Sequence, residues 1–224
     1  PGDRELINKA FNVANKAHWN MRRKSGEPYI LHPIAVAKIV NQEIGLGARS
    51  IATALLHDAV EDTDYTIEEV NKDFGPKIAS LIDGLTKISG TYNKGTSSSM
   101  QAENFRRMLL TLSDDLRVIL IKIADRLHNM RTLDSMTESK KMKIAGETIF
   151  LYAPLANRIG LYAIKSELED LSFKYRQPVI YEEITSKMKH GEKKYYSLIN
   201  KFSLPIINRL NESGLTFEIS GRPK

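Results

Sequence analysis

The side chains best suited to chemistry lie in residues 55–66, which read LLHDAVEDTDYT. His57 and Asp58 are adjacent at the end of an apolar run, and Glu61 and Asp62 follow within one helical turn. In a helix, residues four apart share a face, so each acid lies one turn beyond a member of the His-Asp pair. An unpaired charge is costly to bury, and a divalent metal ion is one partner that could offset it. The segment therefore predicts a metal site beside a potential acid/base pair.

Two more candidate ligands lie outside this segment. His32 precedes Pro33, whose missing N–H suits the first turn of a helix. A single histidine at the start of a helix usually has a structural role. Asp125 lies in a strongly apolar predicted helix, where an acid is expensive unless paired. Lys122 or Arg126 could supply a simple ion pair, and a metal ion is the alternative. Imidazoles and carboxylates together suit Mn, Fe or Zn better than a soft metal. The combined set is His32, His57, Asp58 and Asp125.

Helices must position these residues, because apolar side chains recur at helical spacing along most of the chain. Thr66 and Glu69 form a capping-box pattern that begins one helix, and Gly75 and Pro76 end it. The predicted helices cover residues 5–20, 34–44, the segment that contains His57, 66–74, 76–85, 102–112, 116–131, 140–153, 164–175 and 181–212.

Three stretches depart from the helical pattern. Residues 86–101 are polar, rich in Gly and Ser, and aperiodic, which predicts a mobile loop that could close over a ligand. Residues 153–160 contain Pro154 and Gly160 and predict a break between two helices. Residues 215–219 alternate between apolar and polar side chains and predict a short strand with no obvious partner. The fold class is therefore all-α, with a long helical C-terminal segment and one short strand.

Composition narrows the class of protein without choosing an activity. The chain has 224 residues, of which 42% are hydrophobic and 27% charged, as in a globular protein with a sizeable core. No apolar run approaches a membrane span, and the first residues do not read as a signal peptide. The lack of cysteine excludes disulfides and thiolate metal sites and fits a cytoplasmic protein. A net charge of +6 indicates a solvated basic surface, an anionic ligand or nucleic acid.

The order of the candidate ligands resembles that of the HD phosphohydrolases: one histidine, then an adjacent His-Asp pair, then an aspartate on a later helix. Longer blocks resemble the hydrolase domain of RelA/SpoT-type alarmone enzymes. These blocks are residues 23–33 (RKSGEPYILHP), 56–63 (LHDAVEDT) and 121–133 (IKIADRLHNMRTL). Residues 165–173 (KSELEDLSF) and the closing GRPK also match the long members of that family.

The resemblance implies an HD-domain helical phosphohydrolase fold and a Mn²⁺-dependent enzyme of the stringent response. Its substrate would be guanosine tetra- or pentaphosphate, (p)ppGpp, cleaved at the 3′ position to pyrophosphate and GDP or GTP. Residues 1–176 would form the hydrolase domain. Residues 177–224 would form a helical linker and the truncated start of a synthetase domain, so alarmone synthesis is not expected.

The resemblance also implies roles for individual residues. The metal ligands would be His32, His57, Asp58 and Asp125. Glu61 and Asp62 would handle the attacking water, since a nearby carboxylate can accept its proton. The substrate-binding residues would be Arg23, Lys24, Asn129 and Thr132. The first two would pack against the guanine. Because the His-Asp pair is intact, we expect a live hydrolase.

Two other classes of function stay open. An HD phosphohydrolase could act on another nucleotide; the loop with Arg23 and Lys24 favours an alarmone, and a substrate panel distinguishes the two. A non-catalytic module could bind RNA or a partner through its basic surface, although clustered metal and acid groups argue against an inert binder. We expect a guanine nucleotide as the partner, with no membrane association and no ribosome contact through this segment. The sequence does not predict an oligomeric state.

Overall fold

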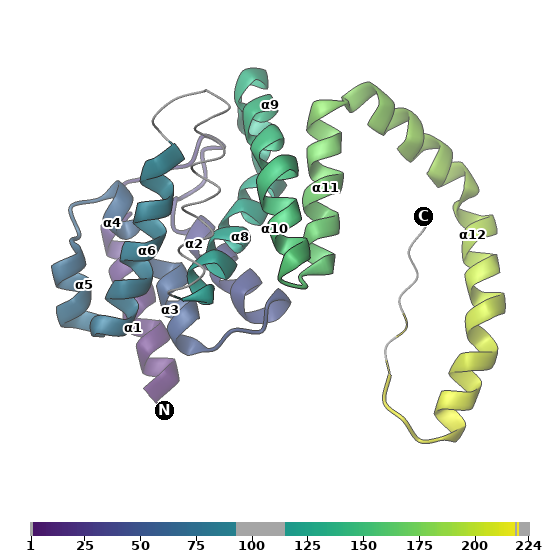
Figure 1. The fold of residues 1–224 in the computed structure, drawn as a ribbon, viewed down its shortest axis with the longest axis horizontal. Helices are drawn as coiled ribbons and strands as arrows, with labels where there is room; N and C mark the ends of the chain where they lie inside the picture. The colour runs from purple at the N-terminus through teal and green to yellow at the C-terminus, as the bar shows by residue number, and fades with distance from the viewer. Residues whose placement is uncertain (1, 93–114, 218, 220–224) are drawn as a thin grey trace. The chain divides into compact units, whose positions relative to one another are not determined.

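The computed structural model describes residues 2–92, 115–217 and 219. Within these residues the regular structure is helical, and the extended pairing is limited to an isolated bridge between Arg22 and Pro28. The all-α fold class predicted from the sequence is therefore confirmed. The chain divides into two compact units, Pro1–Arg176 and Gln177–Lys224 (Figure 1). The assignment of these units to a hydrolase domain and to a linker with the start of a synthetase stays a prediction.

Helices make up most of the first unit in the described part of the chain (Figure 1). In chain order they are α1 (Gly2–Ala17), α2 (Leu31–Lys38), the π-helix η1 (Ile39–Glu43), α3 (Ala48–Leu56), α4 (Ala59–Asp62), α5 (Ile67–Phe74), α6 (Pro76–Tyr92), α8 (Leu116–Arg131), the 3-10 helix η2 (Leu133–Ser135), α9 (Glu138–Glu147), the π-helix η3 (Thr148–Tyr152), α10 (Ala153–Arg158) and α11 (Tyr162–Arg176). The predicted capping box is present at the start of α5, where the side chain of Thr66 accepts from the backbone N–H of Glu69.

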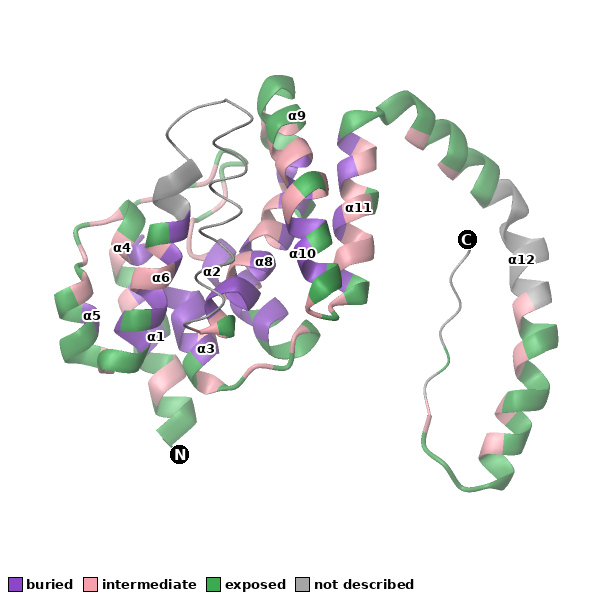
Figure 2. Ribbon diagram, in the orientation of Figure 1, coloured by how far each residue is buried: buried purple, intermediate pink, exposed green. Residues whose placement is uncertain are grey.

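Helix α8 packs against α2, α3, α6 and α11 and contributes heavily to the core of this unit. Apolar side chains cover most of its circumference, as expected of a helix that is enclosed by others. Its buried residues are Val118, Ile119, Leu120, Ile121, Ile123, Ala124, Asp125, Leu127 and Met130. Figure 2 shows the buried residues gathered on α8 and on the helices around it. Asp125 is the acidic member of this set, so the core helix itself carries a carboxylate into the interior.

The start of α8 is fixed against α6. Asp115 caps the helix by accepting from the backbone N–H and the guanidinium of Arg117, and its carboxylate lies 3.1 Å from Lys77 Nζ. The guanidinium beside Asp115 holds the pKa of that carboxyl well below its usual range. On α6, Gly84 has no side chain where a Cβ would lie 3.1 Å from Val118, so glycine allows the two helices to approach closely.

Helix α6 continues to Tyr92, so the predicted loop is wrong over residues 86–92. Leu85 is buried at the predicted end of this helix, and the buried side chain of Ile88 continues the apolar pattern past it. Burial of these residues outweighs the local Gly and Ser content, because packing routinely overrides weak propensities. Residues 93–101 of the predicted loop and the predicted helix over 102–112 lie outside the described residues.

The predicted break over 153–160 is wrong for most of its length. Helical conformation runs from α9 through η3 and α10, and the turn comes only at residues 159–161. Pro154 lies in the first turn of α10, directly after the π-helix. A proline in a first turn is tolerated, and π-helical turns absorb local irregularities of a helix. Gly160 supplies the real break, with a φ of 83° that favours glycine.

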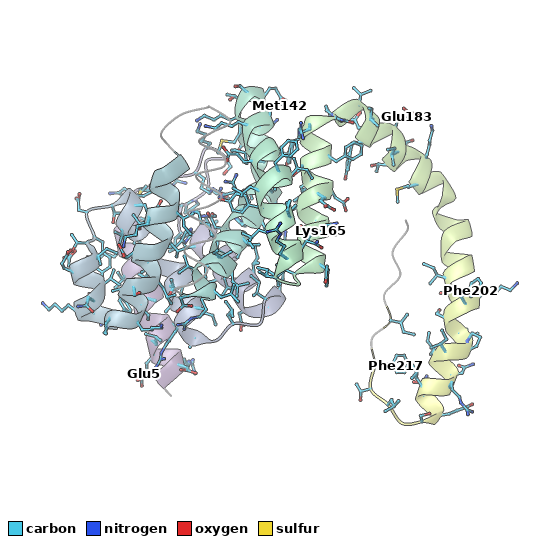
Figure 3. All side chains as sticks on the ribbon, in the orientation of Figure 1. Glu5, Met142, Lys165, Glu183, Phe202 and Phe217 are labelled. Carbon is cyan, nitrogen blue, oxygen red and sulfur yellow. The ribbon has the colours of Figure 1, made fainter. Side chains whose placement is uncertain are left out.

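The second unit is dominated by one helix, α12 (Pro178–Glu212). Phe202 projects from this helix and is 72% exposed (Figure 3). Residues 215–217 and 219 form no strand, so the predicted strand is wrong for these residues. A strand needs a neighbour to satisfy its backbone groups, and the alternating side chains alone do not provide one. Neither α12 nor another helix in the described part of the chain is long and apolar enough to cross a membrane.

Candidate metal centre and adjoining cavity

Three predicted metal ligands, His32, His57 and Asp125, lie together in the interior of the first unit. One ligand atom from each lies within 4.8 Å of the other two. His32 is 3% exposed, His57 1% and Asp125 8%. They come from the first turn of α2, the turn after α3 and the middle of α8. These three helices pack on one another, so the core fold brings together residues that are far apart in the sequence.

The fourth predicted ligand, Asp58, borders the same space. Its Oδ1 lies 3.1 Å from His57 Nε2, and its Oδ2 lies 3.4 Å from His32 Nε2. The Oδ1 atom of Asp125 lies 3.3 Å from His32 Nε2 and 3.9 Å from His57 Nε2. The structure thus brings all four side chains together, and their role as metal ligands stays a prediction.

The His-Asp pair occupies a turn, so the single helix considered for this segment is corrected. Helix α3 ends at Leu56, and the short helix α4 begins at Ala59. The backbone of Asp58 lies at φ −91° and ψ −11°, away from regular helix geometry. The N–H of Asp62 still donates to the carbonyl of Asp58 at 2.8 Å, which preserves the spacing of one turn. The turn leaves His57 buried while Glu61 and Asp62 are exposed.

The tautomer of His57 follows from its backbone contact. Its Nδ1 lies 2.8 Å from the carbonyl oxygen of Ala54, which can only accept a hydrogen bond. Nδ1 therefore carries the proton, and in the neutral ring Nε2 presents a lone pair to Asp58. A metal-binding histidine commonly donates its second ring N–H to a backbone carbonyl in this way.

The tautomer of His32 follows from a longer chain of contacts. Its Nδ1 lies 2.7 Å from His128 Nδ1, and Arg23 Nη1 lies 3.2 Å from the same His128 atom. A guanidinium can only donate, so His128 Nδ1 must be an acceptor. His32 Nδ1 must then carry the proton that bonds to His128. The Nε2 atom of a neutral His32 is left with a lone pair directed at Asp58 and Asp125.

Two imidazole lone pairs and two carboxylates therefore face one another. Acceptors at these distances repel unless protons or a cation lie among them. His57 Nε2 is buried and makes no hydrogen bond to the residues that the structure describes, although a carboxylate oxygen lies within ion-pair distance. The nitrogen and oxygen donors fit a divalent metal ion of the first transition series. A His/Asp group that can hold a divalent metal is thus present.

The second oxygen of Asp125 is held by α8 itself. Lys122 Nζ lies 3.1 Å from Asp125 Oδ2, and Asn129 Nδ2 donates to Asp125 Oδ1 at 2.6 Å. Burial raises the pKa of the Asp125 carboxyl, but Lys122 and the two site histidines outweigh this and lower it well below its usual range. The ion pair that the sequence offered as the alternative to a metal is therefore real, yet it leaves Oδ1 directed at the histidines. The ion pair therefore does not exclude a metal ion at Oδ1, and the role of Asp125 as a metal ligand stays a prediction.

Tyr29 joins the metal centre to the acid pair. Its hydroxyl lies 2.8 Å from Asp58 Oδ2 and 2.7 Å from Asp62 Oδ2. Its ring stacks on the buried His18, with ring centroids 4.8 Å apart. Burial and the two carboxylates raise the pKa of Tyr29 far above its usual value, so the hydroxyl remains a donor. Tyr29 thereby holds Asp62 beside Asp58, and His18 packs against its ring.

A cavity of about 490 Å³ adjoins the candidate metal centre at Asp125. The predicted site residues in its lining are Arg23, Lys24, Glu61, Asp125, Asn129 and Thr132. The other basic side chains in its lining are Lys122, Arg126, Lys140 and Lys143. The close approach of Lys140 lowers the pKa of Lys24, as expected where like charges are side by side. The volume and the basic lining suit an anionic ligand the size of a nucleotide.

Sequence patterns did not mark His128, Tyr29, or Lys140 and Lys143 of α9 as site residues. Burial, together with the neighbouring His32 and Arg23, lowers the pKa of His128 to about 4, so its ring is neutral at pH 7. Both His128 and Tyr29 stand inside the blocks that resemble alarmone enzymes, but only contacts across the fold reveal what they touch. Lys140 and Lys143 lie on α9 with the spacing of an ordinary solvated helix face, which gave no signal of a cavity.

A comparison with protein families shows the class of protein to which this chain belongs. A family model described as the HD domain matches residues 10–162, which is most of the chain. The chain therefore belongs to the HD domain family. The all-α fold and the buried His/Asp group agree with that membership.

Two curated relatives are similar to this chain over nearly its whole length. A GTP pyrophosphokinase of Myxococcus xanthus is 47% identical over 99% of this chain, and a probable guanosine-3′,5′-bis(diphosphate) 3′-pyrophosphohydrolase of Synechocystis is 48% identical over 98%. The matches cover 30% and 29% of those relatives, so this chain spans about a third of their length or less.

A solved structure of a metazoan ortholog of SpoT that hydrolyzes ppGpp is also similar. It has a TM-score of 0.56 and 26% identity, and the match covers 77% of this chain and 96% of that one. The resemblance to RelA/SpoT-type proteins is confirmed.

Proposed function

We propose that this chain hydrolyses guanosine 3′,5′-bis(diphosphate) and its pentaphosphate analogue in a metal-dependent reaction. Water attacks the 3′-diphosphate, the bond between the 3′ oxygen and phosphorus breaks, and the products are pyrophosphate and GDP or GTP. One observation carries the proposal: two imidazoles and two carboxylates converge beside a basic cavity of about 490 Å³. The names of the Synechocystis and Aquifex aeolicus relatives, both pyrophosphohydrolases of this alarmone, support the choice of substrate.

The metal we propose is Mn²⁺, held by His32, His57, Asp58 and Asp125. When bound, it would supply Lewis-acid chemistry, lowering the pKa of water and offsetting phosphate charge. The chain itself would orient the donors through the His57 bond to Ala54 and the His32 bond to His128. The nitrogen and oxygen donor set supports a metal such as Mn²⁺ over a soft one.

Glu61 is the proton acceptor in this proposal. It lines the cavity on α4, one turn beyond the His-Asp pair, without belonging to the buried ligand cluster. A carboxylate near the attacking water, but not bound to the metal, is placed to take the proton. Asp62 would assist from its position on the Tyr29 hydroxyl, which also fixes Asp58. Two adjacent carboxylates can raise one another's pKa toward the working range.

The remaining cavity residues would bind the nucleotide. Arg23 and Lys24 would pack against the guanine, and Asn129 and Thr132 would contact the nucleotide. The hydrogen bonds of Arg23 to His128 and Asn129 run in the plane of the guanidinium, so they leave its face for a purine. Lys140 and Lys143 line the cavity on α9 and could attract the remaining phosphates.

A turnover assay tests this function. Purified protein should convert ppGpp to GDP and pyrophosphate in equal amounts with Mn²⁺, and excess chelator should stop the reaction. A panel of GTP, dGTP, cAMP and ppGpp distinguishes the alarmone hydrolase from an HD phosphohydrolase with another substrate. Faster turnover of another nucleotide would replace the substrate assignment, and no turnover by metal-loaded protein would contradict the enzyme itself.

A further inference from the structure

We propose that His128 is a positioning residue of the metal centre, which it serves as a hydrogen-bond acceptor. Its Nδ1 receives the Nδ1–H of His32 at 2.7 Å and thereby turns His32 Nε2 towards Asp58 and Asp125. Sequence spacing did not mark His128 as a site residue. The inference rests on the metal-binding part of the proposed function.

The direction of the His32–His128 bond is fixed by a third residue. Arg23 Nη1 lies 3.2 Å from His128 Nδ1, and its hydrogen can only be donated. If His128 Nδ1 carried a proton, that proton would face the Arg23 donor as well as His32. The arrangement is satisfied only when His128 accepts from both. Ring contacts add to this restraint, because the His32 and His128 centroids lie 4.9 Å apart.

The same guanidinium supports a second ligand. Arg23 Nη2 donates to Asn129 Oδ1 at 3.0 Å, and Asn129 Nδ2 donates to Asp125 Oδ1 at 2.6 Å. One arginine therefore reaches His32 through His128 and reaches Asp125 through the next residue of α8. Supporting contacts of this kind orient metal ligands, and their loss commonly weakens metal binding.

The test measures Mn²⁺ binding by calorimetry on the whole chain, with three variants. We expect His128→Ala to weaken binding by about 10- to 100-fold, the usual range for the loss of a contact that orients a ligand. His128→Asn keeps an acceptor oxygen near the position of Nδ1, so we expect it to recover most of that loss. Leu127→Ala opens a hole in the core on the same helix without touching the site. It should lower stability while leaving Mn²⁺ affinity within about twofold of wild type.

The outcomes separate this inference from the proposed function. If His128→Ala binds Mn²⁺ as tightly as wild type, or His128→Asn as weakly as His128→Ala, the acceptor role is overturned. A Leu127→Ala chain that loses affinity equally would assign the effect to general destabilisation and also overturn it. If wild type binds Mn²⁺ and shows the expected variant series but leaves ppGpp intact, the proposed substrate fails and His128 keeps its role. If wild type binds no divalent metal, both proposals fail.

Discussion

Lys122 Nζ lies 3.1 Å from Asp125 Oδ2, less than one turn away on α8, in a nearly buried ion pair. The pair neutralises one side of the carboxylate while its other oxygen faces two histidines. Burial lowers the pKa of Lys122, but Asp125 together with Tyr152, Glu61 and Asp58 raises it more, so the lysine stays charged in the folded protein. The core helix thus carries a charged carboxylate at reduced cost, because removing an acid from water without a partner is expensive.

Replacing Lys122 by methionine should destabilise the metal-free protein more than the metal-loaded one. Loss of one partner of a buried pair costs on the order of 3 kcal/mol when the other charge is left uncompensated. A divalent cation at Asp125 would compensate part of that loss. The increase in Tm on adding Mn²⁺ should therefore be larger for Lys122→Met than for wild type. An equal or smaller increase would argue that no metal binds beside Asp125.

Replacing Glu61 by glutamine should separate proton transfer from metal binding. The amide keeps the shape of the side chain and removes its basicity. We expect normal Mn²⁺ content and ppGpp affinity, with kcat reduced by about 100-fold or more. Metal analysis of the purified variant provides the control. If the variant loses metal, Glu61 is a ligand, and if it keeps the wild-type rate, Glu61 is not the base.

The neighbours Arg23 and Lys24 should differ in their effect on the metal. Lys24 is exposed in the cavity, so Lys24→Ala should raise KM for ppGpp by about 3- to 30-fold, as expected for a lost cation–aromatic or phosphate contact. Its Mn²⁺ affinity should be unchanged. Arg23→Ala should raise KM and also weaken Mn²⁺ binding, because it releases His128 and Asn129. If Arg23→Ala and Lys24→Ala bind Mn²⁺ equally tightly, Arg23 does not support the metal ligands through His128 and Asn129.

Asp115 gives a pH-dependent prediction far from the proposed ligands. Its pKa is lowered in the folded state, chiefly by the Arg117 side chain, so its charge contributes stability above the unfolded pKa of about 4. That contribution is lost as pH falls below about 4. Asp115→Asn keeps a capping oxygen and should cost about 1 kcal/mol at pH 7. We expect urea unfolding to show a difference in the free energy of unfolding between wild type and Asp115→Asn that is constant from pH 7 to 5 and smaller at pH 3. A difference of the same size at pH 3 would contradict a stabilising charge on Asp115.

Local patterns in the sequence predicted much of the site and most of the helices. His32, His57, Asp58 and Asp125 could be selected because each is a polar residue at an unusual place in an apolar or capping context. The features that sequence did not predict depend on distant contacts. The site role of His128 depends on its contact with His32, 96 positions earlier in the chain. The role of Tyr29 depends on its contact with Asp58, 29 positions later. No local periodicity encodes such pairs.

The errors in secondary structure have a related cause. Helix α6 extends to Tyr92 through a segment whose Gly and Ser content suggested a loop, because Leu85 and Ile88 are buried in the core. The alternating side chains of residues 215–219 suggested a strand, but alternation specifies a face and not a partner. Tertiary packing decided the first case, and the second segment has no neighbouring strand among the described residues.

Back-titration of metal-stripped protein with Mn²⁺, while ppGpp hydrolysis is recorded, tests the central claim most directly. We expect no activity before addition, a linear rise in pyrophosphate release and a plateau at one Mn²⁺ per chain. Asp125→Ala, folded by circular dichroism, should neither retain the metal nor recover activity. Hydrolysis that is undiminished in the stripped protein, or a chain that binds one Mn²⁺ and leaves ppGpp uncleaved, would contradict the account.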